Sequence, residues 1–299
     1  MKRFLTLMLV LILCLALVAC DFGGKDKDKD DDDGNDEEET SSSGDESSSS
    51  EEDEENAPSS GLKFGLLDDG TYQVINIGTV KGDTLVIPAT YDGEKVTAIK
   101  DNAFQGKTNL KSVTLGENIT RIGSYAFMGC TSLESVTFNE GLTVIGDSAF
   151  YECAALTELE FPSTLETIGS GAFKYCSLIG SIEFNDDIVS IDAHAFSYCT
   201  ALTSVTLPGG LTSVGDAAFL GCSALSNIKI MRGVKMIGRT AFHGCAITSI
   251  TIPSSVSVLG WGVFRNCGAL TAIFCESEGQ PGGWHLEWKY GCNAETVWG

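Results

Sequence analysis

Basic residues are scarce in this chain. Its 299 residues include 19 Lys and Arg against 41 Asp and Glu, which gives a formal net charge of −22. Binding of DNA or RNA needs a basic surface that neutralises phosphates, so the composition excludes a nucleic-acid-binding function. The same charge opposes adsorption to an anionic lipid surface. Disorder of the whole chain is also excluded, because 43% of the residues are hydrophobic and they concentrate after residue 60.

Features typical of catalytic sites are equally sparse. The chain has three histidines, His194, His243 and His285, and none of the motifs G-x-S-x-G, H-E-x-x-H or G-x-x-x-x-G-K-[ST]. His194 lies two residues after Asp192, and we interpret these two as a surface pair rather than a catalytic dyad. We therefore predict that the protein is not an enzyme and has no catalytic residue, cofactor or metal site.

The N-terminal apolar run is too short to span a membrane. It covers the 16 uncharged residues 4–19 behind Lys2 and Arg3, whereas a spanning helix needs about 20, so it predicts a secretory signal. The run ends Leu17-Val18-Ala19-Cys20, which resembles the lipobox of bacterial lipoproteins. The resemblance implies that residues 1–19 are removed, that Cys20 is the lipidation site, and that the lipid holds the chain at an extracytoplasmic membrane surface. The alternative is an ordinary signal peptide with an incidental cysteine.

Residues 20–60 form an acidic segment. Positions 21–60 hold 18 Asp and Glu against 3 Lys, and Phe22 is the one aromatic residue, so the segment predicts a disordered, extended tether. A calcium-binding loop is the alternative. With Gly34 as the turn glycine, Lys29 and Thr40 fall where such a loop needs Asp and Glu, so we favour a solvated spacer.

The rest of the chain is one repeat. Its phenylalanines are separated by six spacings of 23 residues and one of 22, at positions 104, 127, 150, 173, 196, 219, 242 and 264. Cysteines follow three residues after each from Phe127 onward, and apolar residues follow at six, nine and eleven. A fixed period with an L-x-x-V-x-L segment predicts a leucine-rich-repeat solenoid, in which stacked copies complete a shared core.

Each copy is predicted to be of α/β type. The L-x-x-V-x-L segment alternates near its end and predicts one short strand, parallel to the strand of the next copy. The segment Asp147-Ser148-Ala149-Phe150 predicts a short helical turn capped by Asp147. We expect the glycine before it to turn the chain and its alanine to allow close approach between copies.

The repeat resembles a known family. The pattern I-G-x-x-A-F-x-x-C-x-x-L-x-x-V-x-L-P, seen from Ile168-Gly169 through Phe173 and Cys176, resembles the BspA-like leucine-rich repeats of bacterial surface proteins. The resemblance covers about residues 85–275 and implies a cell-surface protein, often linked to adhesion. It gives an N-terminal cap at 61–100 with a hairpin turn at Asp68-Asp69-Gly70, repeats at 101–274, and a C-terminal cap at 275–299.

The cysteines of the repeat are predicted to be reduced. Equivalent cysteines one copy apart have parallel side chains, an orientation poor for a disulfide and for tetrahedral zinc, so we expect a buried packing column. Cys275 and Cys292 flank the C-terminal cap and could form a disulfide. The alternative for Cys275 is simple burial, because it occupies an inward strand position.

The outward strand positions, eight and ten residues after each phenylalanine, are the candidate binding surface. They should build the concave face of the solenoid, which such arrays use for binding. The candidates are Ser135, Thr137, Glu158, Glu160, Ser181, Glu183, Ser204, Thr206, Asn227 and Lys229. The alternative is that Ser and Thr merely suit a solvated sheet. The tryptophans 284, 288 and 298 could stack on sugars, although covering the solenoid end suits them better.

We interpret the chain as a lipid-anchored surface module that binds macromolecules, in the manner of an adhesin. The expected partners are the membrane, through the lipid, and a host matrix protein, mucin or bacterial surface ligand; nucleic acid is not expected. Two other functions stay open: an envelope scaffold or spacer without a soluble ligand, and a carbohydrate-active enzyme.

Overall fold

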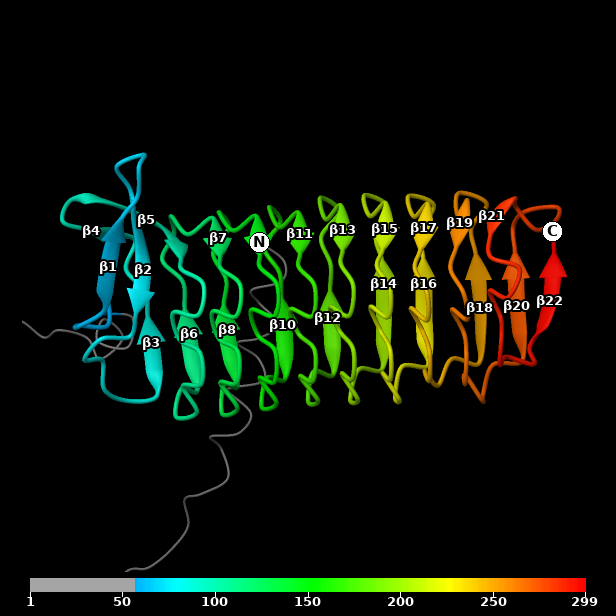
Figure 1. The fold of residues 1–299 in the computed structure, drawn as a ribbon, viewed down its shortest axis with the longest axis horizontal. Coiled ribbons are helices and arrows are strands. Elements are labelled where there is room, and N and C mark those ends of the chain that lie inside the picture. Colours follow the sequence, from blue (N-terminus) through cyan, green and yellow to red (C-terminus); the bar gives the residue numbers. More distant parts are fainter. Residues whose placement is uncertain (1–56) are drawn as a thin grey trace, which may run out of the picture. The chain divides into compact units, whose positions relative to one another are not determined.

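Each repeat forms one coil of a solenoid, and the coils stack along a single axis (Figure 1). The structure is a computed structural model that describes residues 57–299. The predicted signal peptide, the lipidation site Cys20 and nearly all of the predicted tether lie outside this range. Residues 57–299 contain no helix, and hence none long and apolar enough to cross a membrane.

One side of the solenoid carries the strands that the L-x-x-V-x-L segments predict. Neighbouring strands are parallel and form three successive sheets, β3-β6-β8, β10-β12-β14-β16 and β18-β20-β22. Their bounds are β3 Thr84–Val86, β6 Ser112–Thr114, β8 Ser135–Thr137, β10 Glu158–Glu160, β12 Ser181–Glu183, β14 Ser204–Leu207, β16 Asn227–Ile230, β18 Ser249–Ile252, β20 Ala272–Cys275 and β22 Glu295–Trp298.

A second sheet, which the sequence did not predict, runs along the solenoid beside the first. Each repeat coil adds a two-residue parallel strand to it, in most coils just before the glycine of the repeat. These strands are β7 Arg121–Ile122, β9 Val144–Ile145, β11 Thr167–Ile168, β13 Ser190–Ile191, β15 Ser213–Val214, β17 Met236–Ile237, β19 Val258–Leu259 and β21 Gly283–Trp284. Two residues are too few to show an alternating pattern, so the sequence carries no strand signal here.

The predicted helical turn is wrong. Ser148 has a left-handed φ of 52°, and its amide donates to the Ser170 carbonyl of the next coil at 2.8 Å. The Phe150 amide also donates to the next coil, to Ala172 at 2.8 Å. A left-handed residue cannot start a right-handed helix, and the local bonds that follow, from the Tyr151 amide to Ser148 and from the Cys153 amide to Phe150, join residues three apart. Asp147 does not cap its own segment either, because its Oδ1 accepts from the Ser170 amide at 2.8 Å.

The predicted core columns are confirmed. The eight repeat phenylalanines are all buried, and neighbouring rings stack with centroids 5.0–5.9 Å apart and planes within 18°. The aliphatic residues six and nine after each phenylalanine fill the space between the two sheets, and nearly all are buried. The coil therefore closes around one continuous aromatic stack.

The repeat glycines allow close approach of neighbouring coils. A Cβ at Gly146 would lie 2.8 Å from the backbone carbonyl carbon of Gly123 in the preceding coil, and one at Gly215 would lie 2.5 Å from the Ala193 nitrogen. Both glycines also precede a turn, because their carbonyls accept from the amides three residues on, at 3.3 and 3.4 Å. Any side chain here would push two coils apart.

Two β-hairpins lie at the N-terminal end of the described residues. Strands β1 (Lys63–Leu66) and β2 (Tyr72–Asn76) are antiparallel and joined by the predicted turn, where Gly70 has a φ of 85°. Strands β4 (Thr90–Tyr91) and β5 (Glu94–Ile99) form a second hairpin. Strands β2 and β5 then pair in parallel and lead into the two-residue strands of the repeats.

The predicted C-terminal cap is itself one further coil. Its strands β21 and β22 pair with β19 and β20. Trp288 packs edge-on against Phe264, with ring centroids 6.2 Å apart, and so ends the aromatic column. Trp284 and Trp288 are 4% and 3% exposed, so their rings close the core and offer no face to a sugar.

Candidate binding face

The outward strand residues form one exposed row on the first sheet, which we call the row face. In β10 the two glutamates Glu158 and Glu160 are exposed and Leu159 between them is buried. The same alternation holds in β12 and β14. All ten predicted residues of this surface are exposed. Strand register sets Glu160 directly beside Glu183, and Thr206 directly beside Lys229.

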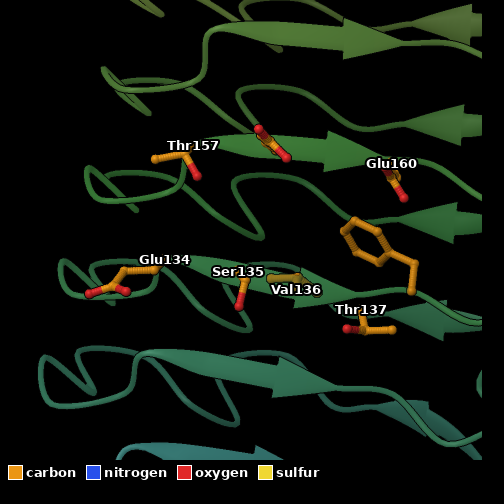
Figure 2. Close-up of a pocket in the computed structure, with 8 residues that line it drawn as sticks. Glu134, Ser135, Val136, Thr137, Thr157 and Glu160 are labelled. Atoms are coloured by element: carbon orange, nitrogen blue, oxygen red, sulfur yellow. The ribbon is translucent and has the colours of Figure 1, made fainter. Parts of the chain in front are cut away.

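Three hollows follow the row face. Their volumes are about 310, 450 and 470 Å³, and each lies over two or three neighbouring strands. The first, between β8 and β10, is lined by Glu134, Ser135, Val136, Thr137, Phe138, Thr157, Glu158 and Glu160 (Figure 2). The second spans β12 to β16 and includes Glu183 and Lys229. The third lies over β16, β18 and β20 and includes Lys229 and Phe274.

The first and third hollows coincide with breaks in strand pairing. Within the part of the chain that the structure describes, β8 is not paired with β10, nor β16 with β18. The second break falls at the one-residue deletion of the repeat, between Cys245 and Ile247. At the first break, a long backbone bond of 3.5 Å from the Thr157 amide to the Glu134 carbonyl joins the coils.

The column eleven residues after the core phenylalanine holds Phe138 and Phe161 at the first break, where Leu115 and Leu207 stand in other coils. The ring centroids of Phe138 and Phe161 are 5.8 Å apart, and those of Phe161 and Phe184 in the next pair of coils are 5.9 Å apart. Strands β10 and β12 nevertheless pair, so bulk in this column does not by itself account for the break between β8 and β10.

Apolar surface is exposed at the bottom of the first hollow. Val136 and Phe138 are both partly exposed there, whereas Val113 and Leu159, which are equivalent to Val136 in the neighbouring coils, are 1% and 3% exposed. The hollow thus has an apolar floor and a polar rim.

Among residues 57–299, the glutamates of the row face have no ionic partner. The ion pairs between side chains of this range join Lys111 to Asp83 at 2.9 Å and Arg232 to Glu276 at 3.3 Å. Glu158, Glu160 and Glu183 take part in neither. Three carboxylates on two neighbouring strands give this part of the face a negative potential.

The cysteine column has a role that the sequence analysis missed. Each of the seven thiols donates to the carbonyl of a phenylalanine in the preceding coil at 3.0–3.3 Å, as Cys153 does to Phe127. A thiol here is both a small apolar group and a donor. Burial raises the pKa of Cys130 to about 11 and that of Cys222 to about 12.

The predicted disulfide partners are both free thiols in the structure. Cys275 and Cys292 are buried, and Cys292 lies near Cys267, at the end of the cysteine column. Cys275 ends β20 and faces the core, as its inward strand position predicts.

The histidines do not assemble a reactive site. His194 Nδ1 lies 3.2 Å from the Ser197 hydroxyl, and the expected pairing with Asp192 is not among the ion pairs within residues 57–299. Ser197 is fully buried and donates to the Ala217 carbonyl at 2.6 Å. Burial lowers the pKa of His194, and nearby Lys174 adds to this. No group of three or more His, Cys, Asp or Glu side chains in the described range could hold a metal ion.

The repeats of this solenoid match a known protein family. The chain matches the family described as BspA type leucine rich repeat region, in six copies, over residues 97–223 and 189–280. The chain belongs to the BspA-type leucine-rich-repeat family. The match spans more than half of the sequence and includes all ten predicted residues of the row face. No curated protein sequence matches the chain.

Solved structures of this BspA-type repeat protein's relatives share its fold. The leucine-rich-repeat protein of T. pallidum is 28% identical over 72% of this chain and 90% of its own, with a TM-score of 0.53. A leucine rich cell surface protein of Faecalibacterium prausnitzii is 31% identical over 75% of this chain and 55% of its own, with a TM-score of 0.56. A Bacteroides ovatus leucine-rich-repeat protein, 24% identical over 80% of this chain and 70% of its own, has a TM-score of 0.58 and supports the fold alone.

Proposed function

We propose that this protein is a lipid-anchored surface module whose row face binds macromolecules. The observation that carries the proposal is the row face itself: an exposed row of short polar side chains, hollowed at three places, on a scaffold locked by buried columns. A rigid scaffold loses little conformational entropy when its exposed residues bind a partner. The cell-surface description of the F. prausnitzii relative supports the location.

Lipid anchoring is tested by acyl labelling. We expect radiolabelled palmitate to enter the wild-type chain and not Cys20→Ala. Equal labelling of the two would contradict the anchor, and would leave an exported protein whose row face could still bind.

Binding is tested with the full chain against immobilised mucin, host matrix proteins and bacterial envelopes. The test variant is Ser181→Arg with Ser204→Arg, which places bulk on the row face. The matched control is Val189→Arg with Met236→Arg, which adds the same charge at exposed positions beside the second sheet. We expect one of these surfaces to lose binding to the test variant alone. Equal retention by both variants would contradict a binding role and favour an envelope scaffold.

A further inference from the structure

We infer that the first hollow, between β8 and β10, is the docking site for an arginine-containing extended segment of a partner protein. This inference rests on the proposed binding function and names the chemistry of its partner. It follows from the shape of the hollow, its floor, and the distribution of charge along the solenoid.

The floor suits the stem and plane of an arginine. Val136 and Phe138 are partly exposed there, and together they offer an aliphatic and an aromatic surface. An arginine side chain packs its methylene stem on apolar surface and its guanidinium plane over an aromatic ring. Lysine, a compact and strongly hydrated charge, uses such a floor less well.

The rim suits the guanidinium charge. Glu158 and Glu160 line the hollow, and Glu183 lies beside Glu160 on the next strand. Figure 2 shows Glu160 on the strand next to Ser135, Val136 and Thr137. Carboxylates accept two parallel hydrogen bonds from one guanidinium, which is the strongest pairing available to a side chain here.

The distribution of charge along the solenoid favours a positively charged occupant for the first hollow. Residues 122–192 hold 11 Asp and Glu and one base, Lys174, whereas residues 193–275 hold one acid, Asp216, and 5 Lys and Arg. The third hollow also lies at a break in pairing and also has an exposed aromatic residue, Phe274. It contains Lys229 and no carboxylate. Charge therefore distinguishes two hollows of similar construction, and selects a cationic segment for the first.

An extended segment fits better than a compact ligand. The hollow is open, and the row of outward side chains continues past it along β12 and β14. An extended chain rises about 3.3 Å per residue and points alternate side chains to one face, so a segment of a few residues spans several coils, which lie about 4.8 Å apart. Basic side chains at alternate positions would then all face the row and could meet the rim glutamates.

The test uses the full chain and four fluorescein-labelled octapeptides in which threonine alternates with arginine, lysine, glutamine or glutamate. We expect fluorescence anisotropy to show binding in the order arginine, lysine, then no binding of the other two. Glu158→Gln with Glu160→Gln and Glu183→Gln should weaken arginine-peptide binding at least tenfold. The matched control, Glu117→Gln with Glu166→Gln and Glu278→Gln, removes the same charge from exposed positions off the row face and should change it less than twofold.

Two further outcomes complete the test. Phe138→Leu, which restores the residue found in the coil before, should reduce the preference for arginine over lysine. Equal weakening by both glutamine triplets would mean general attraction to an acidic protein, and would overturn the docking site, as would failure of the arginine peptide to bind. Either result leaves the proposed function standing if the Ser181→Arg, Ser204→Arg variant still loses binding to a surface macromolecule.

Discussion

Alkaline pH should unfold the solenoid through its buried thiols. In the folded chain the pKa of Cys222 is raised from 9.0 to about 12, and those of Cys130 and Cys267 to about 11, in each case mainly by burial. A group whose pKa is raised by folding favours the folded state below its unfolded pKa. That contribution is lost as the pH rises from about 9 through the folded pKa.

The magnitude follows from the size of the shifts. One pKa unit corresponds to about 1.4 kcal/mol, so at pH 11 Cys222 destabilises the fold by about 2.7 kcal/mol. Cys130 and Cys267, half ionised at that pH, each contribute roughly 2.3 kcal/mol. The three thiols together remove about 7 kcal/mol, which is comparable to the roughly 5–15 kcal/mol that holds a typical domain folded.

The assay is urea unfolding followed by circular dichroism, with a reductant present, at several pH values from 7 to 11. We expect a stable midpoint up to about pH 8.5 and a steep fall above pH 9, where the unfolded thiols ionise. Cys222→Ala should start less stable at pH 7, because it loses a packed sulfur. Above pH 9 its stability should fall less steeply, by about 1.4 kcal/mol per pH unit. An identical slope in wild type and variant would refute the reasoning.

Four other changes probe the scaffold. Gly146→Ala should lower the free energy of unfolding by about 1–3 kcal/mol, because its Cβ would clash with Gly123; urea unfolding measures this. The control is Gly180→Ala, whose Cβ meets no atom within 4 Å. It should lower the free energy of unfolding by under about 1 kcal/mol. Phe173→Ala should cost about 3–5 kcal/mol by leaving a cavity in the aromatic column, and a smaller loss would contradict full burial. Glu152→Gly should stabilise the fold by up to about 1 kcal/mol, because Glu152 holds a φ of 59° where four other coils have glycine. Peptide mapping of alkylated protein should find Cys275 and Cys292 free, and a bond between them would contradict the structure.

The repeat period made the solenoid predictable. Phenylalanines in strict phase can only share a core if copies stack, and the alternation in L-x-x-V-x-L assigns one inward and one outward set. The short turn was not predictable from the same evidence. Asp147-Ser148-Ala149-Phe150 looks like a capped helix start, and only the structure shows that Ser148 is left-handed, with its amide bonded to the next coil.

The sequence predicts which residues form the candidate surface, but not the hollows in it. Alternation placed Glu158, Glu160 and Glu183 outward, as the structure does. The first hollow lies where β8 and β10 do not pair, and the repeat pattern does not predict this break. The sequence also does not predict that the cysteine thiols donate hydrogen bonds, because the accepting carbonyl lies one coil away.

Hydrogen exchange of the full chain with and without the arginine octapeptide tests most directly whether the row face is the binding surface. We expect slower exchange in the segments 134–138, 157–161 and 181–184, and no change in the two-residue strands β9, β11 and β13 of the second sheet. Protection centred on the second sheet, or spread evenly over the solenoid, would contradict the account.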